Sequence, residues 1–178
     1  MAHGRRCCGC INVLAPWSLT PGQTTQVCVS NGTVKTNCLT WPVAQTDPGV
    51  FTVDGSFYAA ALNQDGTVNS ADNPAPLNSV VTVFATGLGP TTPPQADGTL
   101  MGSPTPTNVL PVTVFSDFSS PIGGIQDVNF DVIYAGPALN SVAGMSEVKF
   151  KIVNYPAQIQ VSLPSTTSPG FMVYVAPQ

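Results

Sequence analysis

The stretch AAALNQDGTVNSADNPAPLNSVVTVFATGLGP, residues 59–90, carries the two features that decide the expected fold. Its second half, residues 79–85, is a compact run of β-branched and aromatic residues closed by Gly87, which is typical of a buried strand. Its first half, residues 63–73, is a polar turn dense in side-chain oxygens around Gly66. The stretch therefore predicts a buried strand that the chain enters through an oxygen-rich loop.

Outward from this stretch, short extended runs recur between Pro and Gly breaks along the chain. We expect strands at 11–19, 24–30, 36–44, 50–53, 79–85, 112–115, 128–134, 147–153, 157–163 and 171–175, and a long loop at 90–111. Within 128–134, period-two alternation puts Val128, Phe130, Val132 and Tyr134 on one face. No segment has a convincing helical period. About ten short strands at regular turn spacing predict an all-β fold, a β-sandwich.

Composition limits the classes of partner. Hydrophobic residues make up 43% of the 178-residue chain, enough to bury a core, whereas charged residues make up only 8%, against roughly 25% in a typical soluble domain. The net charge is −4, with only five cationic residues. Since there is no basic stripe, we expect neither nucleic-acid binding nor attraction to anionic membranes. No apolar run of about 18 residues occurs, so we expect no membrane insertion.

The first part of the chain contains five cysteines, Cys7, Cys8, Cys10, Cys28 and Cys38. The first three lie near His3 and form either a weak soft-metal site or an oxidation-prone tail. Cys28 and Cys38 both fall on the polar phase of their runs, so they share one face of a hairpin that turns near residues 31–32. They form either a disulfide, which would indicate an oxidising compartment, or two free thiols on neighbouring strands.

A faint internal repeat suggests how the chain is organised. INVLAPWSLTPGQTTQVCVS, a polar break and DPGVFTV resemble VKFKIVNYPAQIQVSLPSTTSPGFMVYV. We interpret the two copies as the last strands of successive sandwich modules. The expected organisation is an unstructured lead at 1–10, a partial β module at 11–56 and a β-sandwich at 57–178. Residues 11–56 then pack on the second module, pair with another molecule or stay poorly ordered.

Five motifs resemble a known family: PGVFTVDG, AAALNQDGTVNSADNPA, SVVTVFATGLGP, VIYAGPA and the closing SPGFMVYV. They are similar to the uncharacterised C-terminal domain common in large secreted acidobacterial proteins. The ATGLG strand end also resembles the start of IPT/TIG modules, which are immunoglobulin-like. The resemblance covers residues 11–178 and implies an extracellular immunoglobulin-like β-sandwich at the end of a longer secreted or surface protein, with no implied activity. Cys28, Cys38 and the cysteine-rich start depart from the family.

Few catalytic motifs are compatible with this sequence. The only histidine is His3, which argues against a Ser-His-Asp or Cys-His mechanism. There is no G-x-S-x-G elbow, no Walker A sequence and no G-x-G-x-x-G sequence. No apolar signal-peptide core follows Arg5 and Arg6, so we expect a chain that is mature, truncated or without its export signal.

The oxygen-rich loop is the one candidate metal site. On the calcium-loop template its ligands would be Asn63, Asp65, Thr67, Asn69 and Asp72. Gly66 would let the backbone fold around a hard cation. Ala61 would take the first position, where its side chain cannot ligate, and a short Asp replaces the usual bidentate Glu at the last. The sequence leaves two interpretations, a weak calcium site or an Asx-rich turn satisfied by its own backbone.

Two functions are compatible with these observations. The first is a non-catalytic extracellular module for adhesion, display or ligand contact, stabilised by calcium, whose partners are upstream modules, another copy of the chain, or a small-molecule or carbohydrate ligand. Trp17, Trp41, Phe57 and Tyr58 would form a sugar-binding platform, although such aromatics are more often core. The alternative is a calcium-dependent hydrolase of small esters or lactones, such as acyl lactones, whose water is activated by a metal on Asp65 and Asp72.

Overall fold

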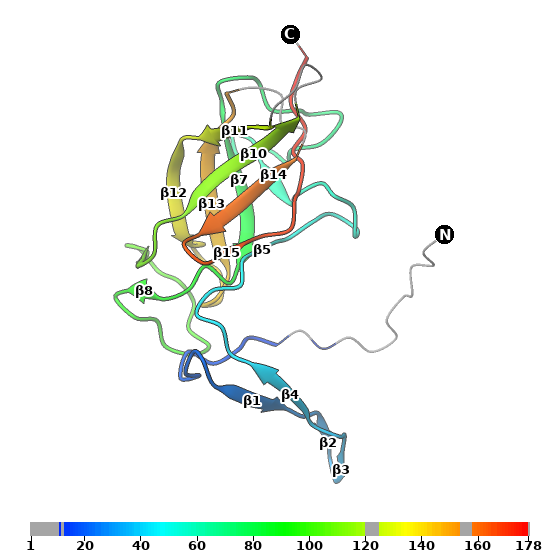
Figure 1. The fold of residues 1–178 in the computed structure, drawn as a ribbon, viewed down its shortest axis with the longest axis vertical. Helices are drawn as coiled ribbons and strands as arrows, with labels where there is room; N and C mark the ends of the chain where they lie inside the picture. Colours follow the sequence, from blue (N-terminus) through cyan, green and yellow to red (C-terminus); the bar gives the residue numbers. More distant parts are fainter. Residues whose placement is uncertain (1–10, 12, 120–124, 154–157, 178) are drawn as a thin grey trace.

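Short antiparallel strands form the framework of the chain (Figure 1). The computed structural model describes residues 11, 13–119, 125–153 and 158–177, and no helix occurs among them. The prediction of an all-β fold is confirmed. The strands are β1 (Thr24–Val27), β2 (Ser30–Asn31), β3 (Val34–Lys35), β4 (Leu39–Pro42), β5 (Gly49–Val50), β6 (Ala61–Leu62), β7 (Val80–Thr86), β8 (Thr91–Thr92), β9 (Thr107–Asn108), β10 (Thr113–Ser119), β11 (Ile125–Phe130), β12 (Val132–Pro137), β13 (Ser146–Lys151), β14 (Ile159–Leu163) and β15 (Thr166–Thr167).

The larger sheet is built around the run that the sequence singles out. Its strand order is β12-β13-β7-β5, and β6 pairs with β7 beside β5. Along β7 every second residue is buried, so Val81, Val83 and Ala85 face inward. β13 alternates in the same way, which places Val148 and Phe150 on the buried face. β-Branched and aromatic side chains favour this half-buried, pleated setting.

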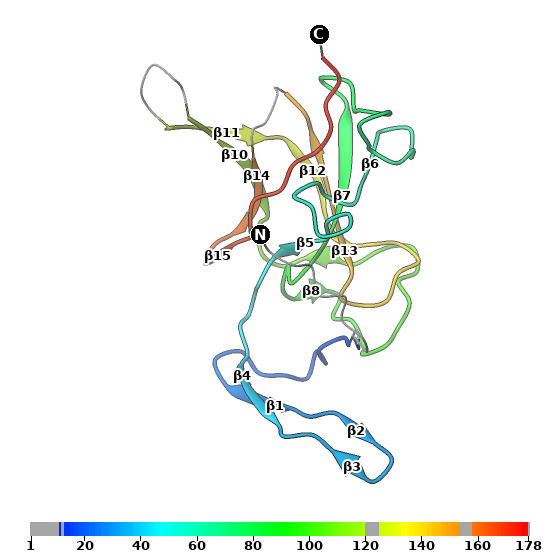
Figure 2. The ribbon, with the colours of Figure 1, turned by 90° about the vertical axis from the view of Figure 1, so that its right-hand side faces the viewer.

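The second sheet has the order β11-β10-β14-β15, and all its pairings are antiparallel. Its buried side chains include Val114, Phe130 and Val161, which belong to the same hydrophobic cluster as Val83 and Phe150 of the larger sheet. Figure 2 shows the sheet with β10 and β14 beside the sheet with β7 and β13. The ring centroids of Phe130 and Phe150 are 5.5 Å apart, so the inner faces of the two sheets are in contact.

The hairpin β1–β4 projects away from both sheets, with the β2–β3 ribbon at its tip (Figures 1 and 2). The prediction of a hairpin that turns near residues 31–32 is confirmed. The chain reaches the sheets again at β5, where Gly49 pairs with Thr86. The hairpin therefore adds almost nothing to the shared core, as its exposed Val27, Leu39 and Trp41 confirm.

Two strand predictions are wrong. Residues 11 and 13–19 contain no strand, because Pro16 removes a backbone donor and a turn forms there, closed by Leu19 N donating to Pro16 O at 3.3 Å. Residues 128–134 do not form one strand: the chain leaves β11 at Phe130, passes through exposed Asp131 and enters β12 in the other sheet. A bulge follows between Val132 and Tyr134. Alternation continues across this corner, so the pattern of the sequence could not reveal it.

Further strand predictions hold only in part. The strand expected at 50–53 is reduced to Gly49–Val50, and that at 171–175 is replaced by single bridges from Phe171, Met172 and Val175. The expected loop at 90–111 contains the short pair β8–β9. The lead at 1–10, with His3 and the cluster Cys7, Cys8 and Cys10, lies outside the described residues.

Candidate functional site

The Asn/Asp loop is built around a buried side chain, Asn69. Its Nδ2 donates to Asn63 Oδ1 at 2.9 Å and to Tyr174 O at 2.8 Å, while Tyr174 N donates to Asn69 Oδ1 at 2.8 Å. The Asn69 amide thus pairs with the backbone of Tyr174 as a neighbouring strand would. Asn63 is buried beside it and donates to Asn73 O at 3.0 Å. These contacts hold the last segment of the chain against the loop.

The exposed part of the loop is an Asx turn at Asp65. Thr67 donates to Asp65 Oδ1 twice, from its hydroxyl at 2.6 Å and from its backbone N–H at 3.0 Å. The Thr67 hydroxyl, and then the Thr67 N–H, lower the pKa of Asp65 below 3.8, because both favour the carboxylate. Gly66 occupies the turn with φ of 83°, a conformation that side chains resist.

These hydrogen bonds bear on the calcium prediction. The structure brings Asn63, Asp65, Thr67 and Asn69 together, but Oδ1 of each of Asn63, Asp65 and Asn69 already accepts a hydrogen bond from within the protein. Asp72 is exposed. No group of three or more His, Cys, Asp or Glu side chains with metal-binding geometry is found in the described ranges. Calcium binding stays a prediction, and the geometry accounts for the loop as an Asx turn.

Calcium melts and an esterase assay test the two metal-dependent expectations. If calcium binds the folded loop, the thermal midpoint rises with calcium and Asp65→Ala abolishes the rise. If the alternative hydrolase is correct, ester or lactone turnover is lost on adding a chelator and in both Asp65→Ala and Asp72→Ala. An unchanged midpoint removes the calcium site, and turnover that is absent or insensitive to chelator removes the hydrolase.

The hairpin is closed by a disulfide between Cys28 and Cys38, ten residues apart, with 4.4 Å between their Cα atoms. The sequence had left this bond and two free thiols as alternatives. In the β1–β4 register, Val27 lies opposite Leu39 and Thr25 opposite Trp41, so these four side chains share the face opposite the disulfide. Leu39 is 61% exposed, Trp41 56% and Val27 46%. One face of this ribbon is therefore an apolar surface in water.

The four aromatic candidates are distributed over several parts of the molecule. Trp17, Trp41 and Phe57 are exposed, so the interpretation that they belong to the core is wrong for these three. Tyr58 is half-buried and stacks on Tyr174, with ring centroids 3.9 Å apart and planes 3° from parallel. Trp17 lines a pocket, whereas Trp41 is on the hairpin.

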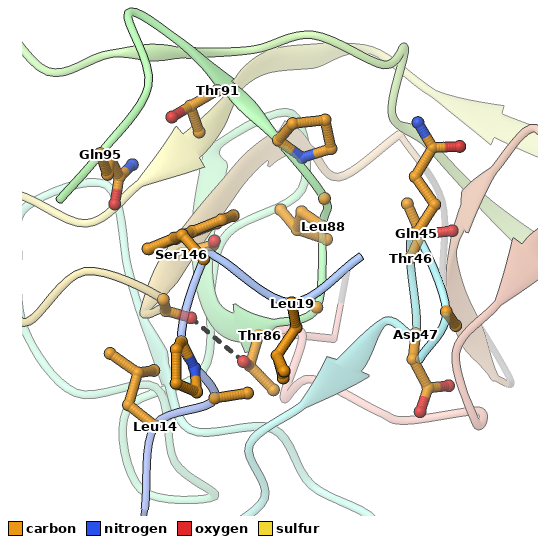
Figure 3. Close-up of a pocket in the computed structure, with 18 of the residues that line it drawn as sticks. Leu14, Leu19, Gln45, Thr46, Asp47, Thr86, Leu88, Thr91, Gln95 and Ser146 are labelled. Atoms are coloured by element: carbon orange, nitrogen blue, oxygen red, sulfur yellow. Dashed lines mark hydrogen bonds between the residues drawn. The ribbon is translucent and has the colours of Figure 1, made fainter. Parts of the chain in front are cut away.

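A pocket of about 490 Å³ lies where the hairpin meets the sheets (Figure 3). One wall is the strap of residues 13–21, which precedes the hairpin. The others come from residues 43–47, from the end of β7 and the chain that follows it as far as Gln95, from Pro137 at the end of β12, and from residues 144–146 at the start of β13. Apolar side chains predominate in the lining: Val13, Leu14, Trp17, Leu19, Val43, Leu88 and Met145.

Two glycines let the walls of this pocket approach each other. Gly87 has φ of 74°, and a Cβ there would collide with the carbonyl oxygen of Asp47. Gly144 has φ of 106°, and a Cβ there would collide with the side chain of Leu14 in the strap. The first contact brings residues 43–47 onto the end of β7, and Asp47 N donates to Gly87 O at 3.0 Å. Side chains at these positions would push the pocket walls apart.

Sequence reasoning missed this pocket. Gly87 and Gly89 were visible in the ATGLG motif, but the sequence associated them only with a strand end. Their close neighbours, Asp47 and Thr46, lie some forty residues earlier in the chain, and the pairing becomes visible only once β5 is placed beside β7. A run of glycines directly after a buried strand is the signal that could have indicated it.

Comparison of the chain with protein-family models, with curated proteins and with solved structures gave no match. No helix among the described residues is long and apolar enough to span a membrane. The family resemblance stated from the sequence motifs therefore stays a prediction.

Proposed function

We propose that this chain is a non-catalytic, immunoglobulin-like β-sandwich module of a secreted protein, and that it contacts another protein through the apolar face of its β1–β4 hairpin. The two antiparallel sheets, whose inner side chains form one cluster across the Phe130–Phe150 contact, support the sandwich. The Cys28–Cys38 disulfide is what an oxidising, extracellular compartment allows.

The observation that carries this proposal is the exposure of Val27, Leu39 and Trp41 side by side on one face of a ribbon. Burying side chains of this size is worth roughly 1.5–3 kcal/mol each, so leaving them in water forgoes that stabilisation. Contiguous exposed apolar surface marks interaction sites in soluble proteins. The disulfide restricts the ribbon, which lowers the entropy cost of docking it.

The partner's surface is expected to be apolar and flat. Lys35 is the only charged residue between Thr24 and Pro42, and it lies at the tip in β3. Charge therefore contributes little to recognition, and contact should be insensitive to salt. Another β-sheet face suits such a ribbon, either in an upstream module of a longer secreted protein or in a second copy of this chain.

Photo-crosslinking at two adjacent positions tests the proposal. A photoreactive amino acid at Leu39 lies on the apolar face, and the same residue at Thr40 lies on the disulfide face as a matched control. In the secreting host, we expect crosslinks to one extracellular protein, or to a second copy, from position 39 and not from position 40. Equal crosslinking at both positions, or none at either, contradicts the proposal.

A further inference from the structure

The pocket beneath the strap has the size and the walls of a small-molecule site. Its volume of about 490 Å³ lies within the roughly 300–1,000 Å³ typical of ligand pockets. Its walls come from segments far apart in sequence, and Figure 3 shows Leu14, Leu19 and Leu88 arranged around the same space. The hairpin's apolar face is a separate surface, so the pocket needs its own explanation.

Hydrogen bonds hold the walls in place without using the space between them. Trp17 N donates to Asp97 Oδ1 at 2.6 Å, which ties the strap to the loop before β9. Thr86 Oγ1 donates to Gly144 O at 3.1 Å across the floor (dashed in Figure 3). A pocket that is already formed loses little entropy when it takes up a ligand.

Three of the four hydroxyl groups in the described lining have partners inside the protein, whereas the buried Oε1 of Gln95 has none among the described residues. Thr91 Oγ1 donates to Pro93 O at 3.1 Å, and Thr46 Oγ1 lies 2.6 Å from Thr166 Oγ1. With Thr86 also paired, three of the hydroxyls are already bonded. A ligand in this pocket would therefore meet mainly hydrocarbon and aromatic surface, which favours an apolar molecule.

Charge excludes one class of ligand. Among the described residues that line the pocket, Asp47 alone is charged, and in Figure 3 its carboxylate is directed away from Leu19 and Leu88. An anion would find no cation to pair with in this described lining, and the net charge of −4 on the protein would repel it. A neutral molecule avoids that repulsion.

From these observations we propose that the pocket binds a neutral, largely aromatic or aliphatic small molecule, held against Trp17, Leu88 and Met145. This inference does not depend on the role of the hairpin. Binding needs no covalent step and no metal ion, since the walls offer burial of apolar surface as the driving force.

Two dyes of nearly identical shape test the proposal. N-phenyl-1-naphthylamine is neutral, and 8-anilinonaphthalene-1-sulfonate adds one sulfonate to the same ring system. The protein is the full chain with its disulfide, carrying Trp41→Phe so that Trp17 is the remaining one of its two tryptophans. We expect the neutral dye to brighten, to quench Trp17 by energy transfer, and to bind at least tenfold more tightly than the sulfonate.

Pocket-filling variants locate the bound dye. Ala44→Phe and Ala15→Phe introduce a ring from two different walls, and each should weaken binding of the neutral dye at least tenfold. Ala71→Phe, exposed and outside the lining, is the matched control and should leave binding unchanged. Leu39→Ser should also leave it unchanged, which separates the pocket from the hairpin face.

Several results would overturn the proposal. They are no binding of the neutral dye, no quenching of Trp17, equal affinity for the sulfonate, or equal effects of Ala71→Phe and the filling variants. Near-ultraviolet circular dichroism checks that each variant is folded. If both filling variants fail to fold, the Trp17 quenching and the dye pair in the Trp41→Phe protein still decide the question.

Discussion

At the scale of single residues, Asn69 does what an additional strand would do. Its amide donates to the carbonyl of Tyr174 and accepts from the N–H of the same residue, and a second donation reaches Asn63. Buried amides of this kind stabilise a fold only when every polar atom is paired, because an unpaired one costs its full desolvation.

Replacing this side chain should therefore cost more than one hydrogen bond. Asn69→Ala leaves the N–H and carbonyl of Tyr174 and the Oδ1 of Asn63 without this partner. We expect the free energy of unfolding to fall by about 2–3 kcal/mol in urea titrations. The exposed Asp72→Ala should change it by less than about 0.5 kcal/mol. A loss at Asn69 as small as that of the control would contradict the pairing.

The Asp65 turn predicts a pH dependence. Because the bonds from Thr67 lower the pKa of Asp65 in the folded state below 3.8, the unfolded chain binds more protons over the interval between the two pKa values. The stabilisation is fully present above 3.8 and is lost as the pH falls through the folded-state pKa. Near neutral pH the wild-type protein should melt at a higher temperature than Asp65→Asn, and this difference should vanish in acid, where Asp65 is protonated. A difference that grows as the pH falls would contradict the prediction.

The sequence could predict that this loop gathers oxygens, but not which partners they would take. Asn69 meets Tyr174, which is 105 residues away in the chain. A pattern of neighbouring residues can predict only local contacts, such as the turn between Asp65 and Thr67, which the Asx-rich interpretation describes correctly. Whether these oxygens bind a cation or a distant backbone group depends on tertiary contacts, and so the sequence left both interpretations open.

At the scale of elements, the hairpin and the corner at Asp131 show what local patterns can decide. Alternation and the turn residues predicted the hairpin and put Cys28 and Cys38 on one face, because both signals act between near neighbours. The alternation of apolar and polar residues did not reveal the corner at Asp131, because it continues unbroken where the chain passes from one sheet to the other. The strand expected at 11–19 failed for another reason: Pro16 removes a backbone donor and a turn follows it, and the apolar side chains of residues 13–19 line a pocket.

Cleavage by trypsin tests the hairpin's disulfide. Lys35 is exposed at the tip, between Cys28 and Cys38, so a chain cut there should stay in one piece until a reductant is added. In the double variant Cys28→Ser/Cys38→Ser the pieces should separate at once. The variant should also be cut faster, because it lacks a disulfide that, for a loop of this length, stabilises the folded hairpin by about 3 kcal/mol. Separation of the native protein without reductant would contradict the bond.

At the scale of the whole molecule, two sheets share one core while the hairpin lies outside it. Phe150 is fully buried in β13 and contacts Phe130 of the other sheet. The pocket forms at the boundary between these two parts, where the strap, the base of the hairpin and the end of β7 meet. The proposed contact surface and the proposed ligand site are therefore both consequences of one arrangement.

A core substitution should report on both sheets. Phe150→Ala removes a ring from the centre of the cluster, and we expect a loss of about 3–5 kcal/mol in the free energy of unfolding. Ile133→Ala is the control, since Ile133 is 59% exposed on the edge strand β12. Equal, small losses for the two variants would mean that Phe150 is not in a shared core.

Amide hydrogen exchange, resolved by residue, tests most directly the claim that two sheets form one core with the hairpin outside it. We predict that amides of β7, β13 and β14 exchange together, at the rate set by global unfolding, while those of β1 and β4 exchange far faster through local opening. Exchange of β1 and β4 at the global rate would contradict this division. Exchange of β14 independently of β7 and β13 would contradict the shared core.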